Sequence, residues 1–341
     1  SKEISRNILM SKNSNIIAVT MGDPSGVGTE IAIRAKIKKI KKPNFFIIHD
    51  PDFVKKIIKK MKSNLKVRKI NSPSEVKKLP KNYLAVLPIK ISKSTQLGKK
   101  NLSNTKSILK SIDLAVKLAK NGEVAAIVTN PINKDVIGKK VKNFRGHTEY
   151  LAKKDRTNDQ LMVMMNKNMK TIPLTTHIAV NKVSSKINKK NIIKAIINAN
   201  ISLRNDFKIK KPRIAVTALN PHAGDGGLIG DDEKVKIIPA INYCKKKKIS
   251  VEGPLPADSA FIKNNQNKYD IFICMFHDQA LIPVKMISFD ETVNFTAGLS
   301  FVRTSPDHGT GLDIAKKFIA SPNSLIAAMK SASKIAQARR K

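Results

Sequence analysis

The stretch 16–35, IIAVTMGDPSGVGTEIAIRA, predicts a buried strand, a tight glycine-rich turn and the start of a helix. Its first five residues are apolar and mostly β-branched, as expected of a strand that is covered on both faces. The turn GDPSGVGTE (22–30) could receive an anion on its backbone N–H groups. It matches neither G-x-G-x-x-G nor a P-loop, so the common nucleotide motifs are absent. A tight turn that only needs glycine is an equal alternative.

The same alternation of apolar and helix-period segments continues along the chain and predicts an α/β fold. A helix is expected after Ser103 and Asn104, and another at Ser321, where Pro322 suits the first helical position. The predicted strands are IIAVT (16–20), FFIIH (45–49), LAVL (84–87), VAAIVT (124–129), LMVMM (161–165), RIAVTA (213–218) and DIFICMF (270–276).

The composition limits the classes of protein that fit. With 341 residues, 41% of them apolar, the chain is long enough for two lobes with real cores. No apolar run approaches the roughly 20 residues that cross a bilayer, so no membrane partner is expected. The two cysteines, Cys244 and Cys274, do not make a disulfide framework, and a reducing cytoplasm is the expected compartment.

The net charge is unusual: 65 Lys and Arg against 25 Asp and Glu give a formal +40. A field of that size would attract nucleic acid, so a basic nucleic-acid-binding protein is one alternative. However, the lysines are spread along the chain, and no aromatic residues interleave the basic runs as a single-strand binding surface requires. We therefore interpret them as solvated surface charges and expect no nucleic-acid partner.

Three histidines lie at or just beyond the ends of predicted strands. His177 follows TIPLTT, His222 follows RIAVTALNP, and His277 ends DIFICMF. Open α/β sheets bind ligands at the carboxyl ends of their strands. Three neutral imidazoles would leave an open position on a catalytic metal ion, but three satisfied structural histidines fit the pattern as well.

Further candidates lie downstream. Lys285 has apolar neighbours in PVKM, which is unusual for lysine, and Arg303 follows the apolar LSFV. A guanidinium in that position is suited to grip a carboxylate or phosphate. The segment HGTGLD (308–313) offers glycines for a close approach of backbone to ligand, followed by an acid that could bind a ribose hydroxyl.

These segments together resemble the 4-hydroxythreonine-4-phosphate dehydrogenase family of vitamin B6 biosynthesis. The match runs from residue 19 to 315, in family order, and its motifs are long and unusual. They are VTMGDPSGVGTEIAIRA, VTNPINK, GHTEYLA, LTTHIAV, ALNPHAGDGGLIGDDE, GPLPADSAF, MFHDQALIPVKM and NFTAGLSFVRTSPDHGTGLDIA.

The resemblance implies the two-lobed, three-layer αβα fold of the isocitrate and isopropylmalate dehydrogenases, without an ordinary Rossmann domain. We place the first lobe at 12–140 plus 305–341 and the second at 141–304. The resemblance also implies a homodimer whose active site is shared between the subunits.

The family's site residues fall on matching positions of this chain. The metal ligands would be His177, His222 and His277, with Zn expected and Mg or Co as alternatives. The implied substrate-binding residues are His147, Thr148, Lys285, Asn294 and Arg303, with Lys285 also the candidate for proton transfer. At the loop that holds the adenosine of NAD in related dehydrogenases, NAD or NADP would contact His308, Gly309 and Asp313.

The implied reaction is the oxidation of 4-phosphohydroxy-L-threonine. The same machinery would also suit another phosphorylated hydroxy acid, such as threonate or erythronate 4-phosphate, which is the same-class alternative. One departure follows the cofactor loop: similar proteins continue DIAGKG, whereas this chain has Lys316 and Phe318 in place of the two glycines.

Overall fold

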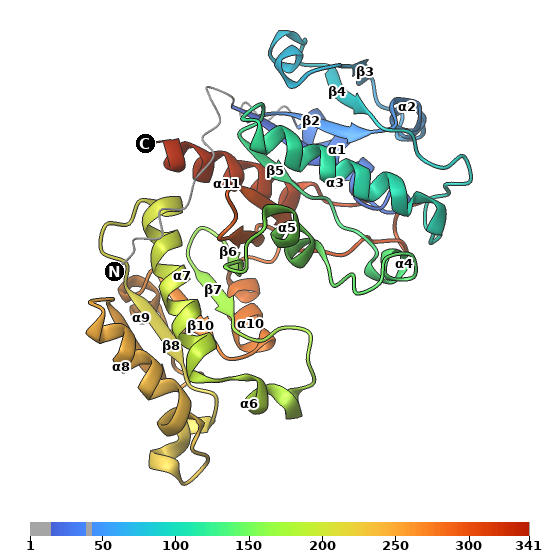
Figure 1. Cartoon of the computed structure of the whole chain (residues 1–341). Coiled ribbons are helices and arrows are strands. Elements are labelled where there is room, and N and C mark those ends of the chain that lie inside the picture. The colour runs from blue at the N-terminus through green and yellow to red at the C-terminus, as the bar shows by residue number, and fades with distance from the viewer. Residues whose placement is uncertain (1–14, 39–42, 341) are drawn as a thin grey trace. The chain divides into compact units, whose positions relative to one another are not determined.

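The computed structural model describes residues 15–38 and 43–340. The chain divides into two compact units, of which unit 1 runs to Asn158 and resumes at Leu299, and unit 2 is Asp159–Gly298 (Figure 1). The boundaries predicted from the sequence lie elsewhere, at 140/141 and 304/305. Residues 12–14, 39–42 and 341 of the predicted first lobe lie outside the described residues.

Packing explains why unit 1 extends beyond the predicted boundaries. Helix α5 (His147–Asp155) buries Leu151 and Ala152 in the core of unit 1. Strand β12 (Arg303–Pro306) pairs with β5 (Ala126–Val128) of the same unit. Candidate residues on α5 and β12 therefore belong to unit 1, whereas the prediction placed them with the histidines that follow strand ends.

The sheet of unit 1 consists of parallel strands in the order β3-β4-β2-β1-β5-β12. Its remaining strands are β1 (Ile16–Thr20), β2 (Asn44–His49), β3 (Lys66–Lys69) and β4 (Tyr83–Pro88). Strand β1 lies between β2 and β5, so the strand order changes direction there: β2 lies on one side of β1 and β5 on the other. Ligands of open parallel sheets bind at the carboxyl ends of strands around such a point.

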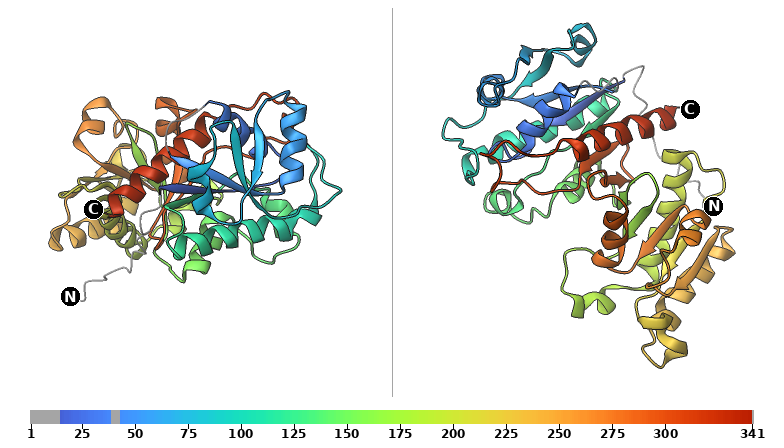
Figure 2. Two further views of the ribbon diagram at one scale, coloured as in Figure 1. Left: turned by 90° about the horizontal axis from the view of Figure 1, so that it is seen from above. Right: turned by 180° about the vertical axis from the view of Figure 1, so that it is seen from behind.

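Helices cover both faces of this sheet. They are α1 (Gly28–Ile37), α2 (Pro51–Lys60), α3 (Thr105–Lys120), α4 (Lys134–Gly138), α5 and α11 (Asn323–Arg340). Ile16 and Ala18 of β1 pack with α3, while α11 contacts β12, β5 and α1. The blue strands accordingly lie between the teal α3 and the red α11 in the left view of Figure 2. Burial on both sides explains why β1 is apolar throughout.

Unit 2 has a mixed sheet in the order β11-β6-β7-β10-β8-β9. Strands β7, β10, β8 and β9 are parallel, while β11 and β7 pair antiparallel with β6. Their bounds are β6 (Leu161–Met165), β7 (Lys170–Pro173), β8 (Ile214–Thr217), β9 (Val251–Leu255), β10 (Ile271–Cys274) and β11 (Val293–Ala297). The helices are α6 (Val183–Lys186), α7 (Lys189–Phe207), α8 (Ile238–Lys246), α9 (Lys263–Lys268) and α10 (His277–Ile287).

The α/β prediction is confirmed, and each predicted strand overlaps an observed one. The helix predicted after Ser103 and Asn104 is α3, and the carbonyl of Pro322 accepts the first hydrogen bond of α11, from Ile326 at 2.9 Å. Four observed strands, β3, β9, β11 and β12, were not predicted, and β7 was indicated only by the apolar stretch TIPLTT that precedes His177. Within the described residues, none of the helices combines the length and apolarity that crossing a bilayer requires.

Candidate active site

The pairing of β7 with β10 brings two of the predicted metal ligands together in unit 2. Beyond the strands, the N–H of Leu174 donates to the carbonyl of Cys274 at 2.8 Å, and the pairing continues to Thr175. As a result, the rings of His177 and His277 lie 6.1 Å apart, centroid to centroid, at an interplanar angle of 42°. Two imidazoles that bind one zinc ion through bonds of about 2 Å have a comparable separation.

His277 also has a carboxylate neighbour. Its Nδ1 lies 2.8 Å from Oδ1 of Asp278. A carboxylate at one ring nitrogen fixes the tautomer and leaves the other nitrogen as the metal-binding atom. The pair thus has the chemistry of an oriented metal ligand.

His222 follows β8, on the other side of β10. The chain from His222 to Gly226 is left-handed, with φ between 43° and 81°, and the His222 side chain is exposed. Gln279 ties this strand end to the start of α10: its Oε1 accepts from the Thr217 hydroxyl and the Met275 N–H, both at 2.9 Å. Its Nε2 donates to the carbonyl of Ala218 at 2.8 Å.

Residues 15–38 and 43–340 contain no group of three or more His, Cys, Asp or Glu side chains in a metal-holding arrangement. His177 and His277 are brought together, whereas His222 is placed on the loop of the neighbouring strand and does not join them in such a group. The three-histidine set therefore stays a prediction.

Lys285 and Asn294 also belong to unit 2. Lys285 lies in the last turn of α10, half-buried, with its Nζ 5.5 Å from the centroid of the Phe289 ring. Asn294 lies on β11, and its Oδ1 is a buried acceptor with no hydrogen-bond partner. An orphaned buried acceptor is costly to the protein and is typical of a position that a ligand completes.

Arg303 is the most deeply buried cation of the candidate set. It lies on β12 of unit 1 with 2% of its surface exposed, and its Nε and Nη2 donate to the Thr129 hydroxyl at 3.1 and 2.7 Å. Burial lowers its pKa to about 9, with the charge of Glu149 acting in the opposite direction. The guanidinium remains protonated at neutral pH, so a positive charge is held in a poorly solvated place.

His147 lies close to this buried charge. It is the first residue of α5, and burial, with added repulsion from Arg303 and Lys134, holds its pKa well below the usual range. Its Nε2 is buried and has no hydrogen-bond partner. The imidazole is therefore neutral at pH 7 and offers Nε2 to a ligand. Thr148 follows it on α5 and is half-buried.

Lys134 was not among the residues predicted from the sequence. It lies at the start of α4, and a Cβ added to Gly146, just before His147, would come within 3.5 Å of its Nζ. The sequence could have indicated Lys134, because this residue ends the matched motif VTNPINK. Arg303, Lys134 and His147 form what we call the cationic cluster of unit 1, and such a cluster is suited to an anion.

The predicted cofactor loop packs on the glycine-rich turn that follows β1. The N–H of Val27 donates to the carbonyl of Thr310 at 2.9 Å, and a Cβ on Gly26 would lie 2.4 Å from that same oxygen. Glycine is required at this contact. The two glycine-rich segments noted in the sequence are thus one structural feature of unit 1.

Within this loop, the predicted cofactor residues differ in surroundings. His308 Nδ1 lies 2.9 Å from the carbonyl oxygen of Gly309, and its Nε2 is buried without a hydrogen-bond partner. Nothing lies within 4 Å of a Cβ added to Gly309, and Asp313 is exposed. Phe318, at a position where the resemblance implies a glycine, has a left-handed φ of 51°.

Comparison with known proteins gives one consistent result. The protein family described as "Pyridoxal phosphate biosynthetic protein PdxA" matches residues 41–332. The chain is 37% identical over 339 residues to the 4-hydroxythreonine-4-phosphate dehydrogenase of Methylorubrum populi, covering 96% of both chains. It is 38% identical over 333 residues to the enzyme of that name from Caulobacter vibrioides, covering 96% of this chain and 99% of the relative.

The solved structures agree. The crystal structure of 4-hydroxythreonine-4-phosphate dehydrogenase from Klebsiella pneumoniae is 34% identical, with a TM-score of 0.85, and the match covers 95% of this chain and 100% of that one. The similarity thus extends over both units and includes every motif that carries a candidate residue.

Proposed function

The chain belongs to the PdxA family of pyridoxal phosphate biosynthetic proteins, and we propose that it oxidises 4-phosphohydroxy-L-threonine with NAD or NADP as hydride acceptor. The product would be 2-amino-3-oxo-4-(phosphooxy)butanoate, a 3-oxo acid that decarboxylates to 3-amino-2-oxopropyl phosphate. The family match, nearly end to end with its relatives, supports the activity, and the chemistry of the two units supports the roles below.

The observation that carries the proposal is the cationic cluster of unit 1. Arg303 is held protonated in a buried position, and Lys134 adds a second positive charge beside His147. A phosphate monoester would relieve the repulsion between these groups and accept several charge-assisted hydrogen bonds. We assign phosphate binding to this cluster, with the Thr148 hydroxyl as a further donor.

We assign a divalent metal ion to His177, His222 and His277, with Zn as first choice and Mg or Co as alternatives. The paired rings and the Asp278 carboxylate beside His277 fit such a ligand set. When bound, the ion would lower the pKa of the substrate hydroxyl and stabilise the charge that develops on its oxygen.

Lys285 is our candidate for moving the hydroxyl proton. Its half-buried Nζ, which lies beside the Phe289 ring, would transfer the proton or orient the reacting oxygen. The orphaned Oδ1 of Asn294 would accept a hydrogen bond from a donor group of the substrate.

We place the nicotinamide cofactor at the loop that carries His308, Gly309 and Asp313. Open space at Gly309 permits a close approach of the ligand to the backbone, and the exposed Asp313 carboxylate is able to accept from ribose hydroxyls. The bound cofactor supplies the hydride acceptor, which is the part of the reaction that no side chain provides.

We also propose that two copies of the chain form a homodimer whose active site is shared, and that the protein works in the cytoplasm. Both cysteines are buried free thiols, which suits a reducing compartment. Sedimentation equilibrium of the purified protein measures the oligomeric state, and a monomer at micromolar concentration would contradict the shared site.

The decisive experiment is NADH formation from 4-phosphohydroxy-L-threonine by metal-loaded and metal-stripped protein. Threonate 4-phosphate and erythronate 4-phosphate are tested beside it, because the same residues would bind their phosphates. We expect turnover of the amino acid substrate to exceed that of both alternatives. Faster turnover of either one would reassign the substrate.

A further inference from the structure

We infer that Glu233 is a positioning residue that holds the loop carrying His222. It acts through His222, and the inference rests on the proposed metal role of that histidine. Glu233 begins a turn of π-helix (Glu233–Ile237) that leads into α8. The loop itself comprises residues 219–230, from the end of β8 to Gly230.

The loop needs an external restraint. His222, Ala223 and Asp225 have φ values of 52°, 56° and 43°, and each is a non-glycine residue in the left-handed region. A Cβ makes this conformation unfavourable, so a run of such residues does not persist without contacts that enforce it. The His222 side chain itself is exposed.

Glu233 supplies that restraint from a buried position. Its side chain is 3% exposed, and its Oε1 accepts from the backbone N–H groups of Leu219 and Asn220, both at 2.8 Å. Its Oε2 accepts from Nδ2 of Asn220 at 3.0 Å. One carboxylate therefore fixes the backbone and a side chain just ahead of His222.

The same carboxylate also contacts the loop just beyond His222. A Cβ added to Gly224 would lie 2.7 Å from Oε2 of Glu233 and 2.8 Å from the carbonyl oxygen of Gly230. Only glycine allows this approach, so the loop closes directly over the carboxylate. His222 is thus bracketed by contacts to Glu233 on both sides along the chain.

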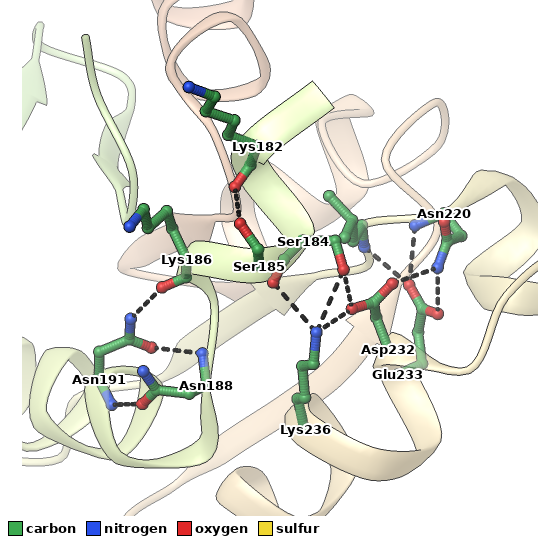
Figure 3. A network of polar contacts seen from close by, with 11 residues as sticks. Lys182, Ser184, Ser185, Lys186, Asn188, Asn191, Asn220, Asp232, Glu233 and Lys236 are labelled. Carbon is green, nitrogen blue, oxygen red and sulfur yellow. Dashed lines mark hydrogen bonds and ion pairs between the residues drawn. The ribbon is translucent and has the colours of Figure 1, made fainter. Parts of the chain in front are cut away.

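A second set of contacts holds the residues beside Glu233, and Figure 3 shows these contacts together with the hydrogen bonds of Glu233 to Asn220. The neighbouring Asp232 accepts from the Ser184 hydroxyl of α6 at 2.7 Å and pairs with Lys236. Nζ of Lys236 in turn donates to the carbonyl oxygen of Ser184 at 3.0 Å. Asp232 and Lys236, which flank Glu233, are therefore tied to Ser184 of α6.

We assign Glu233 no direct catalytic role. Both of its oxygens are engaged by the protein, and its function is to reduce the freedom of His222 before the metal binds. Removing a group that orients a metal ligand typically weakens metal binding 10- to 100-fold.

The test is a double-mutant cycle on metal affinity, with Zn²⁺ as the probe and the full-length protein throughout. Glu233→Ala, His222→Ala and the double variant are titrated with Zn²⁺ against a competing chelator. We expect Glu233→Ala to weaken Zn²⁺ binding on the order of 10- to 100-fold, and to have little further effect once His222 is alanine. Glu233→Gln, which keeps one acceptor oxygen, should recover part of the loss.

The control is Glu252→Ala. Glu252 is another carboxylate of unit 2, and it accepts from Lys268 and Tyr269 at 2.7 and 2.6 Å rather than from the loop. Its removal should leave Zn²⁺ affinity unchanged. If Glu233→Ala does not fold, the cycle is measured with Glu233→Gln.

The results distinguish the positioning role of Glu233 from the proposed metal role of His222. If His222→Ala weakens Zn²⁺ binding but neither Glu233 variant does, the metal role stands and the positioning role is overturned. An equal loss from Glu233→Ala with and without His222 would show a general structural effect and also overturn it. If His222→Ala leaves Zn²⁺ affinity unchanged, the proposed metal role fails and the inference fails with it.

Discussion

His177 and His277 lie ring to ring, 6.1 Å between centroids, although they come from separate motifs. Parallel pairing of β7 with β10 produces this contact, because the strands end at the same edge of the sheet and each is followed by its histidine. Strand pairing thus brings together two of the proposed metal ligands, a contact that no local spacing encodes.

Removal of one of these rings tests the metal site. We expect His277→Ala to abolish stoichiometric Zn²⁺ binding and turnover, and chelation of the unmodified protein to silence it until Zn²⁺ is returned. Metal content and NADH formation are the measurements, and His49→Asn in unit 1 is the control histidine variant. Full activity in excess chelator would contradict the metal role.

Arg303→Ala is expected to act on binding of the phosphorylated substrate. Hydrogen bonds to a charged partner contribute about 1.5–3 kcal/mol, so KM should rise about 10- to 100-fold with a smaller change in kcat. Arg303→Lys keeps the charge but not the planar guanidinium, so its KM should lie between that of the unmodified protein and that of Arg303→Ala. An unchanged KM in Arg303→Ala would remove this residue from the phosphate site.

The pKa of His147 reports on the cationic cluster. Burial is the main cause of its low pKa, and Arg303 and Lys134 lower it further. Inorganic phosphate bound at the cluster should therefore raise this pKa, and Lys134→Gln should raise it in the absence of ligand. NMR titration of the His147 ring measures both shifts, and a pKa that is insensitive to phosphate would argue against anion binding there.

His49 makes stability depend on pH. It is buried with neutral-ring hydrogen bonds: Nδ1 accepts from the Asp50 N–H at 2.7 Å, and Nε2 lies 2.9 Å from the Thr29 hydroxyl. Burial lowers its pKa from 6.5 to about 4, with the charge of Asp50 opposing the shift. Below pH 6.5 the unfolded chain binds a proton that the folded protein excludes. Stability is therefore complete above that pH and is lost as the pH falls through about 4.

The expected loss is about 3 kcal/mol, from the size of the shift at about 1.4 kcal/mol per unit. Urea unfolding at pH 7, 5.5 and 4.5 measures it, with His49→Asn as comparison. The asparagine variant should be less stable at pH 7 but should lose less on acidification. Parallel pH profiles for the two proteins would contradict the assignment.

Phe318 occupies a backbone conformation that favours glycine. Its φ of 51° is left-handed, and its carbonyl oxygen accepts from the Arg34 guanidinium, which fixes the conformation. Phe318→Gly should be about 1 kcal/mol more stable than Phe318→Ala, since only glycine is unstrained there. At Lys317, which lacks a positive φ, the same pair of variants should show the opposite order. Thermal unfolding measures both pairs.

The sequence by itself determined the fold class, because strands such as β1 and β10 are apolar on both faces and carry their own signal. It also located the family motifs and the strand-end histidines. Short strands were missed where the pattern is polar: β3, with the sequence KVRK, exposes most of its residues and offers no alternation to detect.

Only the tertiary structure decided which residues meet. Long-range strand pairing and packing set the contact of His177 with His277, the burial of Arg303 against Thr129, and the approach of Lys134 to His147. The same forces placed α5 and β12 in unit 1, against the predicted boundary. Local patterns fix the period and ends of an element, but strand order and pairing depend on contacts between distant segments, which no window of sequence contains.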